Sequence, residues 1–247
     1  MKRNYINLLA IAGFAMTMAC TPKPEGADAE VSEAKEVEDV QASKTYAINT
    51  GESTVTWIGS KPTGKHDGTI PISSGTIKVE DGKIVGGSID MNVAEIKNND
   101  LAENAEMQGK LVNHLKSDDF FAAEQYPDAN FTITSVAKYS GDEEMDVKEE
   151  YETEYKPASA DEYMVESPTH KITGNLTMRG KTLSVTFPAN VKMDDGKVMA
   201  SAKFNIDRTQ WGLMYGDEAD AVDKAKDKFI YNTVNVGFNV VANAENM

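Results

Sequence analysis

Residues 233–240 read Thr-Val-Asn-Val-Gly-Phe-Asn-Val, with apolar side chains at every second position. A period of two places Val234, Val236 and Phe238 on one face of an extended chain. An amphipathic helix would instead show apolar residues every three or four positions. Residues 229–241 are therefore predicted to form a strand with one face in an apolar interior.

The same alternation recurs along the chain and predicts further strands. They cover residues 53–59, 75–79, 83–93, 130–138, 171–178, 182–192 and 198–207. Asp81-Gly82 and Asp195-Gly196 lie between neighbouring segments, and Asp-Gly is typical of two-residue hairpin turns. Consecutive strands joined by such turns pair in an antiparallel sheet.

A single segment breaks this pattern with helical spacing. Leu101, Leu111 and Leu115 fall on one stripe of a helix that Asn99 or Asp100 could cap. About eight antiparallel strands and one helix form a barrel or a sandwich, and closure into a barrel removes the exposed sheet edges. We therefore expect an all-β fold: an elongated eight-stranded antiparallel barrel with one helix packed on or over it.

Charge and composition exclude several functions. The 247 residues include 40 acidic and 25 basic side chains, for a net charge of −15, which argues against binding to nucleic acid. One cysteine excludes a disulfide framework, and three widely separated histidines show no metal-ligand spacing. No nucleophile elbow or phosphate-binding glycine loop is present. We expect no enzyme activity, no metal and no cofactor.

The N-terminus has the features of a processing signal. Lys2 and Arg3 precede an apolar run that is too short to span a bilayer, and the run ends at Cys20. The lone cysteine lies where a bacterial lipoprotein signal is cut and acylated, which predicts a signal peptide at residues 1–19 and lipidation of Cys20. An ordinary cleaved signal with a chance cysteine is the alternative. The expected location is the bacterial cell envelope, lipid-anchored, at the outer membrane.

Acidic charge is concentrated in two polar segments. Residues 20–44 lack aromatic side chains and are predicted to be a flexible tether. Residues 141–167 hold eleven acidic and two basic side chains and are predicted to be a solvated insertion in a barrel domain that spans residues 45–242. A basic protein partner for this insertion is the alternative role.

The inward-facing positions of the predicted strands are nearly all apolar. As candidate ligand-binding residues they are Val55, Trp57, Ile89, Met91, Phe131, Ile133, Ile172, Leu176, Val185, Phe187, Phe204, Val234, Val236 and Phe238. An eight-stranded barrel is either filled by its own side chains or holds one slender ligand, and pattern alone leaves both open. Any ligand must be apolar along most of its length.

Three segments resemble the YceI family, lipocalin-like bacterial proteins that bind polyisoprenoids or related lipids. They are His114-Leu-Lys-Ser-Asp-Asp-Phe-Phe121 with the following Tyr126-Pro127, then Gly174-Asn-Leu-Thr-Met-Arg-Gly180, then Ile206-Asp-Arg-Thr-Gln-Trp-Gly212. The resemblance implies an elongated barrel with a long apolar chain in its bore: an isoprenoid, a quinone or a fatty-acyl compound. The implied role is sequestration or transport of that lipid, and the alternative is a ligand-free interaction module.

Two side chains invite specific hypotheses. Acidic charge after a helix opposes the helix dipole, so Asp119 is expected to pair with a cation, and Arg208 is the candidate. His114, beside Leu115 on the apolar stripe, is expected to have a structural role.

Overall fold

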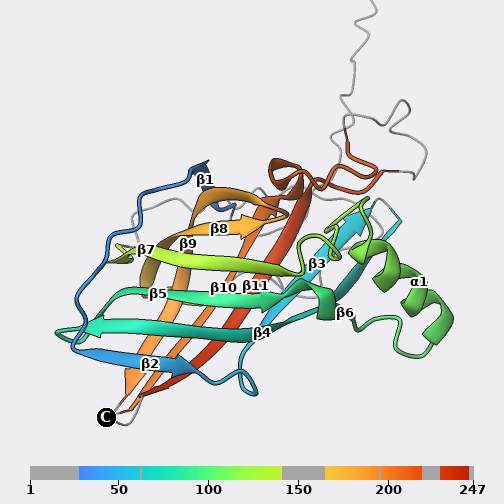
Figure 1. Cartoon of the computed structure of the whole chain (residues 1–247). Helices are drawn as coiled ribbons and strands as arrows, with labels where there is room; N and C mark the ends of the chain where they lie inside the picture. The colour runs from blue at the N-terminus through green and yellow to red at the C-terminus, as the bar shows by residue number, and fades with distance from the viewer. Residues whose placement is uncertain (1–27, 62, 141–164, 195, 219–228, 245–247) are drawn as a thin grey trace, which may run out of the picture.

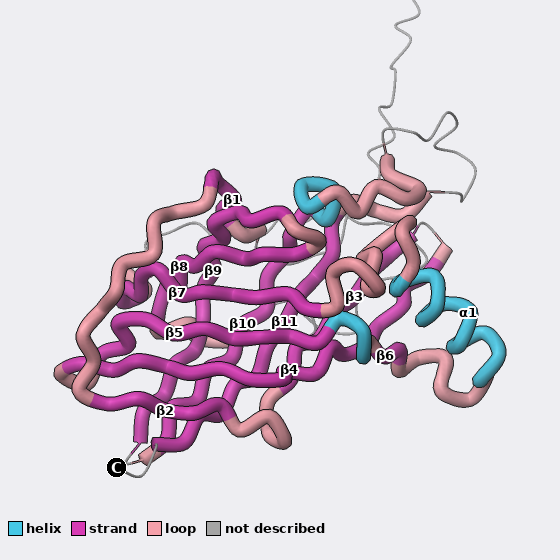
Figure 2. Tube along the Cα trace, in the orientation of Figure 1, coloured by secondary structure: helices cyan, strands magenta, loops and turns pink. Residues whose placement is uncertain are grey.

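The structure is a computed structural model that describes residues 28–61, 63–140, 165–194, 196–218 and 229–244. Within these ranges the chain forms a closed eight-stranded antiparallel barrel with one α-helix at its side (Figures 1 and 2). The predicted fold class is confirmed. The predicted signal peptide, Cys20 and residues 141–164 of the predicted insertion lie outside the described residues.

The strands follow the predicted alternation, and several are longer than expected. They are β1 Glu30–Glu33, β2 Lys44–Ile48, β3 Thr54–Lys61, β4 Gly64–Glu80, β5 Lys83–Asn92, β6 Lys97–Asn98, β7 Asp128–Lys138, β8 His170–Met178, β9 Lys181–Asp194, β10 Lys197–Asp207 and β11 Thr233–Ala244. The helix α1 spans Ala105–Lys116, and two 3₁₀ turns span Val93–Glu95 and Arg208–Trp211.

Eight positions around the barrel close the sheet. The order is β4, β5, β7, β8, β9, β10 and β11, and the eighth position is shared by β2 and β3, which both pair with β11 and β4. Pairing of β8 with β9 completes the ring. In this ring β7 and β11 are four positions apart and therefore face each other across the bore.

Tight turns fix the register of the hairpins. Asp81 and Gly82, between β4 and β5, both have positive φ, at 49° and 71°. Arg179 and Gly180, between β8 and β9, have φ of 49° and 73°. Two consecutive left-handed residues make the turn whose twist matches that of the paired strands, and Gly reaches this conformation at no steric cost.

The segment predicted as a flexible tether differs from that expectation over residues 28–44. Strand β1 pairs with β9 at residues 183–186, where β10 has separated from β9, and the Ala29 amide donates to the carbonyl of Asn205 on β10. β1 thus fills a gap in the barrel wall. The chain then runs along one end of the barrel to β2 (Figure 1).

Helix α1 begins later than either predicted cap. Asn104 is the N-cap, and its side chain accepts a hydrogen bond from the amide of Met107 at 3.1 Å. Asp100 is occupied by other donors, described below, so its carboxylate does not cap the helix. In the described part of the chain no helix has the length and apolar character needed to cross a membrane.

Candidate functional site

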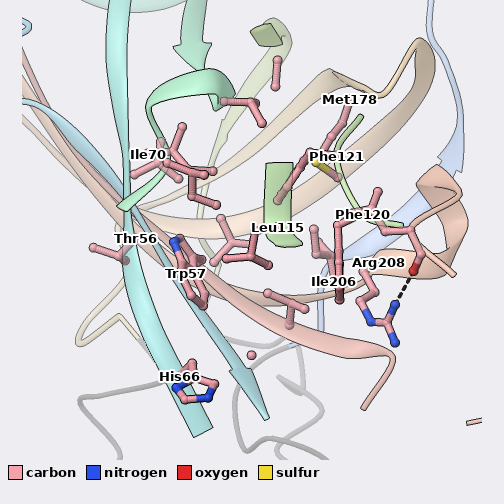
Figure 3. Close-up of a pocket in the computed structure, with 18 of the residues that line it drawn as sticks. Thr56, Trp57, His66, Ile70, Leu115, Phe120, Phe121, Met178, Ile206 and Arg208 are labelled. Atoms are coloured by element: carbon pink, nitrogen blue, oxygen red, sulfur yellow. Dashed lines mark hydrogen bonds between the residues drawn. The ribbon is translucent and has the colours of Figure 1, made fainter. Parts of the chain in front are cut away.

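A cavity of about 310 Å³ lies inside the barrel, next to α1 (Figure 3). This volume is at the lower end of the range for ligand sites. Its walls come from β3, β4, β5, β7, β8, β10 and β11, and Leu111 and Leu115 of α1 cover it. Aliphatic and aromatic side chains make up most of the wall, so the cavity favours an apolar occupant.

The structure brings six of the fourteen predicted ligand-binding residues together around this cavity. They are Val55, Trp57, Met91, Leu176, Val234 and Val236. They come from four strands, β3, β5, β8 and β11, and closure of the barrel places them around one space.

The other eight predicted residues pack elsewhere in the interior and do not line the cavity. They are Ile89, Phe131, Ile133, Ile172, Val185, Phe187, Phe204 and Phe238. Seven of them belong to the main hydrophobic core, and the partly buried Phe238 packs against it; Val185 and Phe187 are only 1% exposed. The bore is therefore hollow in one part and filled by side chains in the rest.

Sequence patterns missed several lining residues because these lie outside the alternating runs. Phe120 and Phe121 follow α1, and Leu213 and Ile230 lie in the loop between β10 and β11. Leu111 and Leu115 were visible as the apolar stripe of the helix, but the stripe alone did not indicate what it covers.

Trp57 is held rigidly at the cavity wall. Its indole Nε1 donates to the carbonyl of Lys97 on β6 at 3.2 Å. A Cβ on Gly68, its cross-strand partner on β4, would lie 2.6 Å from the indole ring and 1.8 Å from the Lys97 carbonyl oxygen. Only glycine at position 68 leaves room for this arrangement.

Polar groups gather at the end of the cavity formed by the β3–β4 hairpin. Ser60, Lys61 and His66 line it there, and His66 lies apart from the apolar cluster around Trp57 (Figure 3). The imidazole Nδ1 of His66 is 2.7 Å from the carboxylate of Asp100, and His66 is 37% exposed. A ligand with a polar head and an apolar tail would find several hydrogen-bonding groups at this end.

Asp100 organises this polar end. Burial alone would raise the pKa of its carboxyl, but hydrogen bonds from His66, the Asp67 amide and Asn98 outweigh burial and leave the pKa below its ordinary value. Asn98 also accepts from the Leu101 amide and, through its carbonyl, from Gln108 of α1. The same cluster thus ties the helix to the cavity mouth.

Arg208 lines the cavity from the 3₁₀ turn that follows β10 and is 3% exposed. Its guanidinium donates to the carbonyls of Leu213, Ile230 and Tyr231 and lies over the ring of Phe120, 5.8 Å from its centroid. Burial lowers the pKa of Arg208, and the nearby carboxylates of Asp217, Asp207 and Glu218 oppose that shift. An arginine remains charged in any such setting.

The predicted Asp119–Arg208 pair is wrong. Asp119 accepts from His114 Nε2 at 3.0 Å, and Arg208 is engaged by backbone carbonyls. The cation at the end of α1 is Arg179, which donates to the carbonyls of Asp118, Phe120 and Gly212. The segment that follows α1 therefore contacts the β8–β9 turn, which supplies Arg179, and does not pair with Arg208 as the sequence predicted.

His114 packs within an aromatic cluster at the end of α1. Its ring makes edge contacts with Phe120 and Tyr215, with centroids 5.1 and 4.5 Å apart. Trp211 is 1% exposed and donates from Nε1 to the carbonyl of Leu176. These contacts hold Phe120 against the cavity, so the segments that carry the family resemblance build one wall of the site.

Within the described ranges, no three His, Cys, Asp or Glu side chains are grouped so as to hold a metal ion. The geometry offers an apolar volume, a polar rim and a helical cover. Such a site can hold an amphiphilic molecule by burial of its apolar part.

The YceI-like domain model matches residues 46–242. No curated protein matches the chain. Among solved structures, BcnA of Burkholderia cenocepacia is 20% identical, with a TM-score of 0.54 over 79% of this chain and 99% of BcnA. A polyisoprenoid-binding domain from Saccharophagus degradans, implicated in plant cell wall breakdown, is 15% identical, with a TM-score of 0.53 over 81% of this chain and 98% of that domain. At these identities the likeness concerns the fold.

Proposed function

The chain belongs to the YceI-like domain family, and from this premise we propose that its barrel binds a polyisoprenoid-like or other long apolar chain, for sequestration or transport in the bacterial envelope. The cavity of about 310 Å³ under α1 carries the proposal, because its wall is apolar and its polar groups are confined to the mouth and to Arg208. Binding, and not catalysis, is the proposed activity. The polyisoprenoid-binding neighbour supports this ligand class.

Native mass spectrometry of the full chain carrying Cys20→Ser, purified without detergent, tests the proposal. We expect a stoichiometric adduct that organic solvent releases, and the adduct mass identifies the lipid class. A bare protein mass, unchanged after incubation with isoprenoids, quinones and fatty acids, would contradict ligand binding.

We also propose that acylated Cys20 anchors the protein to the outer membrane. The only cysteine of the chain follows a short apolar run, and this supports the proposal. In cells, the wild-type protein is expected in the membrane fraction with incorporated radiolabelled palmitate. Cys20→Ser is expected to lose the label and leave that fraction, and a labelled Cys20→Ser protein would place the lipid elsewhere.

The charge of residues 141–167 supports an alternative function, binding of a basic protein partner. Deletion of these residues distinguishes the two functions. It is expected to leave lipid adducts unchanged, and it would abolish partner binding if the alternative is correct.

A further inference from the structure

Four phenylalanine rings close the bore directly below the cavity. Phe131 comes from β7, Phe187 from β9, Phe204 from β10 and Phe238 from β11. We call them the phenylalanine layer. Phe131 and Phe238 belong to strands on opposite sides of the ring, yet their ring centroids are 6.2 Å apart. The layer therefore spans the full width of the barrel.

The rings pack tightly against one another. Phe187 and Phe204 stack with centroids 4.1 Å apart, and Phe238 meets both edge-on at 5.2 and 5.6 Å. Phe131 lies 5.6 Å from Phe187. Stacked and edge-to-face pairs at these distances are the favourable geometries of aromatic rings. Phe131, Phe187 and Phe204 are at most 4% exposed, and Phe238 is partly buried against them, so the four rings form a closely packed layer.

Alternation along each strand places this layer one step below the cavity. On β11, Val236 lines the cavity and Phe238 is the next inward residue. On β7, Ala129 lines it and Phe131 follows, and on β10, Ile206 lines it and Phe204 precedes. Inward residues on a strand are two positions apart, so the layer forms the floor of the cavity.

Glycine at position 174 keeps the layer in place. A Cβ there would lie 2.3 Å from Cζ of Phe131, so the bare backbone of β8 makes room for the ring. The interior beyond the layer contains more buried side chains, such as Ile172, Val198 and Val240.

The depth of the cavity follows from β3, which lines it from Val55 at one end to Lys61 at the other. Six steps along a tilted strand span roughly 15 Å of the barrel axis. An extended chain advances roughly 1.2 Å per bond, so this depth holds about twelve chain atoms. That is about three isoprene units, or a medium-length acyl chain.

We propose that the phenylalanine layer is the floor of the ligand site and limits the enclosed hydrocarbon to about twelve chain atoms. The inference rests on the proposed function, because it concerns the same cavity. Both prenyl and acyl chains meet the floor, since each is a linear apolar chain. Longer chains leave their remaining carbons outside the mouth near Lys61 and His66.

The test is a titration of the full chain carrying Cys20→Ser with straight-chain fatty acids of graded length, followed by tryptophan fluorescence, because Trp57 lines the cavity. The Kd is expected to fall about fourfold per added methylene up to about twelve carbons, and then to stay constant. We call the chain length at which the Kd stops falling the break. Prenols of graded length, from geraniol to octaprenol, are expected to show the same limit, so that farnesol and octaprenol bind with similar Kd. If the acid and prenol series break at similar lengths, the site selects its ligands by chain length. If only one series shows a break, the phenylalanine layer limits that class of ligand alone.

Two variants move the floor in opposite directions. Val236→Phe fills one layer of the cavity, and its break is expected about four carbons earlier. Phe238→Leu opens the layer, and its break is expected at longer chains. Phe229→Leu is the matched control, because Phe229 is buried against Tyr231, lies outside both the cavity and the layer, and loses the same side-chain volume. Its break is expected to stay at the wild-type length.

Kd values that continue to fall beyond sixteen carbons in the wild-type protein would contradict the proposal that the phenylalanine layer limits chain length. They would remain consistent with the proposed lipid-binding function. A break at the same length in wild type and Val236→Phe would do the same. Absence of binding by every chain would overturn both. If Phe238→Leu does not fold, the wild-type break and Val236→Phe still decide the matter.

Discussion

At the scale of single residues, two charged groups at the cavity have different roles. Arg208 is a buried cation whose donors all reach backbone carbonyls of the loop that precedes β11. Asp100 is a partly exposed anion that joins the hairpin, β6 and the start of α1. Arg208 therefore shapes the wall, and Asp100 holds the mouth.

Arg208→Ala is expected to lower the free energy of unfolding by about 3 kcal/mol or more, because three buried carbonyls lose their donor. Urea denaturation of the variant measures this loss. Arg179→Ala is the matched control, since Arg179 also donates to three carbonyls but is half-buried, and about 1 kcal/mol is expected there. Equal losses in the two variants would contradict the role assigned to burial.

The lowered pKa of Asp100 predicts that the folded protein loses stability in acid. The folded state holds the pKa of this carboxyl below 3.8, so the unfolded state binds its proton first as the pH falls. Its contribution to stability is present above about pH 4 and is lost below it. The melting temperature of wild type is expected to fall more steeply between pH 5 and pH 3 than that of Asp100→Asn. Parallel curves would show that Asp100 does not contribute.

At the scale of elements, strand β1 (Glu30–Glu33) precedes the barrel domain predicted from the sequence, which begins at residue 45, yet it forms part of the barrel. It covers the part of β9 that β10 leaves unpaired. The buried side chain of Asn175 on β8 then binds the next segment, accepting from the Lys35 amide at 2.9 Å and donating to the Lys35 carbonyl at 2.7 Å. The segment between the predicted anchor and the barrel thus contributes to the barrel wall.

Asn175→Ala is expected to release residues 34–40 from the barrel while the barrel itself stays folded, because both hydrogen bonds to Lys35 are lost. Hydrogen exchange of these backbone amides measures the change, and at least a tenfold increase in rate is expected, equivalent to about 1.4 kcal/mol. Thr177→Ala serves as control, because Thr177 is on the same strand and its hydroxyl pairs with that of Thr182 of β9 at the exposed surface. Unchanged exchange in Asn175→Ala would mean that β1 pairing alone holds the segment.

At the scale of the whole molecule, the barrel interior combines a densely packed part and a hollow part. The phenylalanine layer and the core beyond it supply dense packing, while the cavity under α1 leaves apolar walls without contacts. The unfilled part therefore costs stability that a bound chain restores.

A bound chain is expected to stabilise the folded protein as a whole. Dodecanoic acid at a hundred times its Kd is expected to raise the free energy of unfolding by about 2.7 kcal/mol, measured by urea denaturation. Val236→Phe is expected to gain less from the acid and to be no less stable without it, because its ring occupies the same space. Equal gains in the two proteins would place the acid outside the cavity.

Much of this protein is determined by local sequence. Alternation along β7, β8, β9, β10 and β11, the Asp81-Gly82 turn and the stripe of α1 predicted the fold, because side-chain periodicity reports which face of an element is buried. Strands β1, β2 and β6 and residues 64–74 of β4 were not predicted. They contain short or irregular runs, and their pairing depends on partners far along the chain.

Only the tertiary structure decided which inward residues line the cavity. Val236 and Phe238 share one face of one strand and look equivalent in sequence, yet one lines the cavity and the other closes it. A period of two fixes the face of a side chain but not its height along the barrel. That height depends on strand register and closure, which bring Phe131 and Phe238 together from opposite sides of the bore.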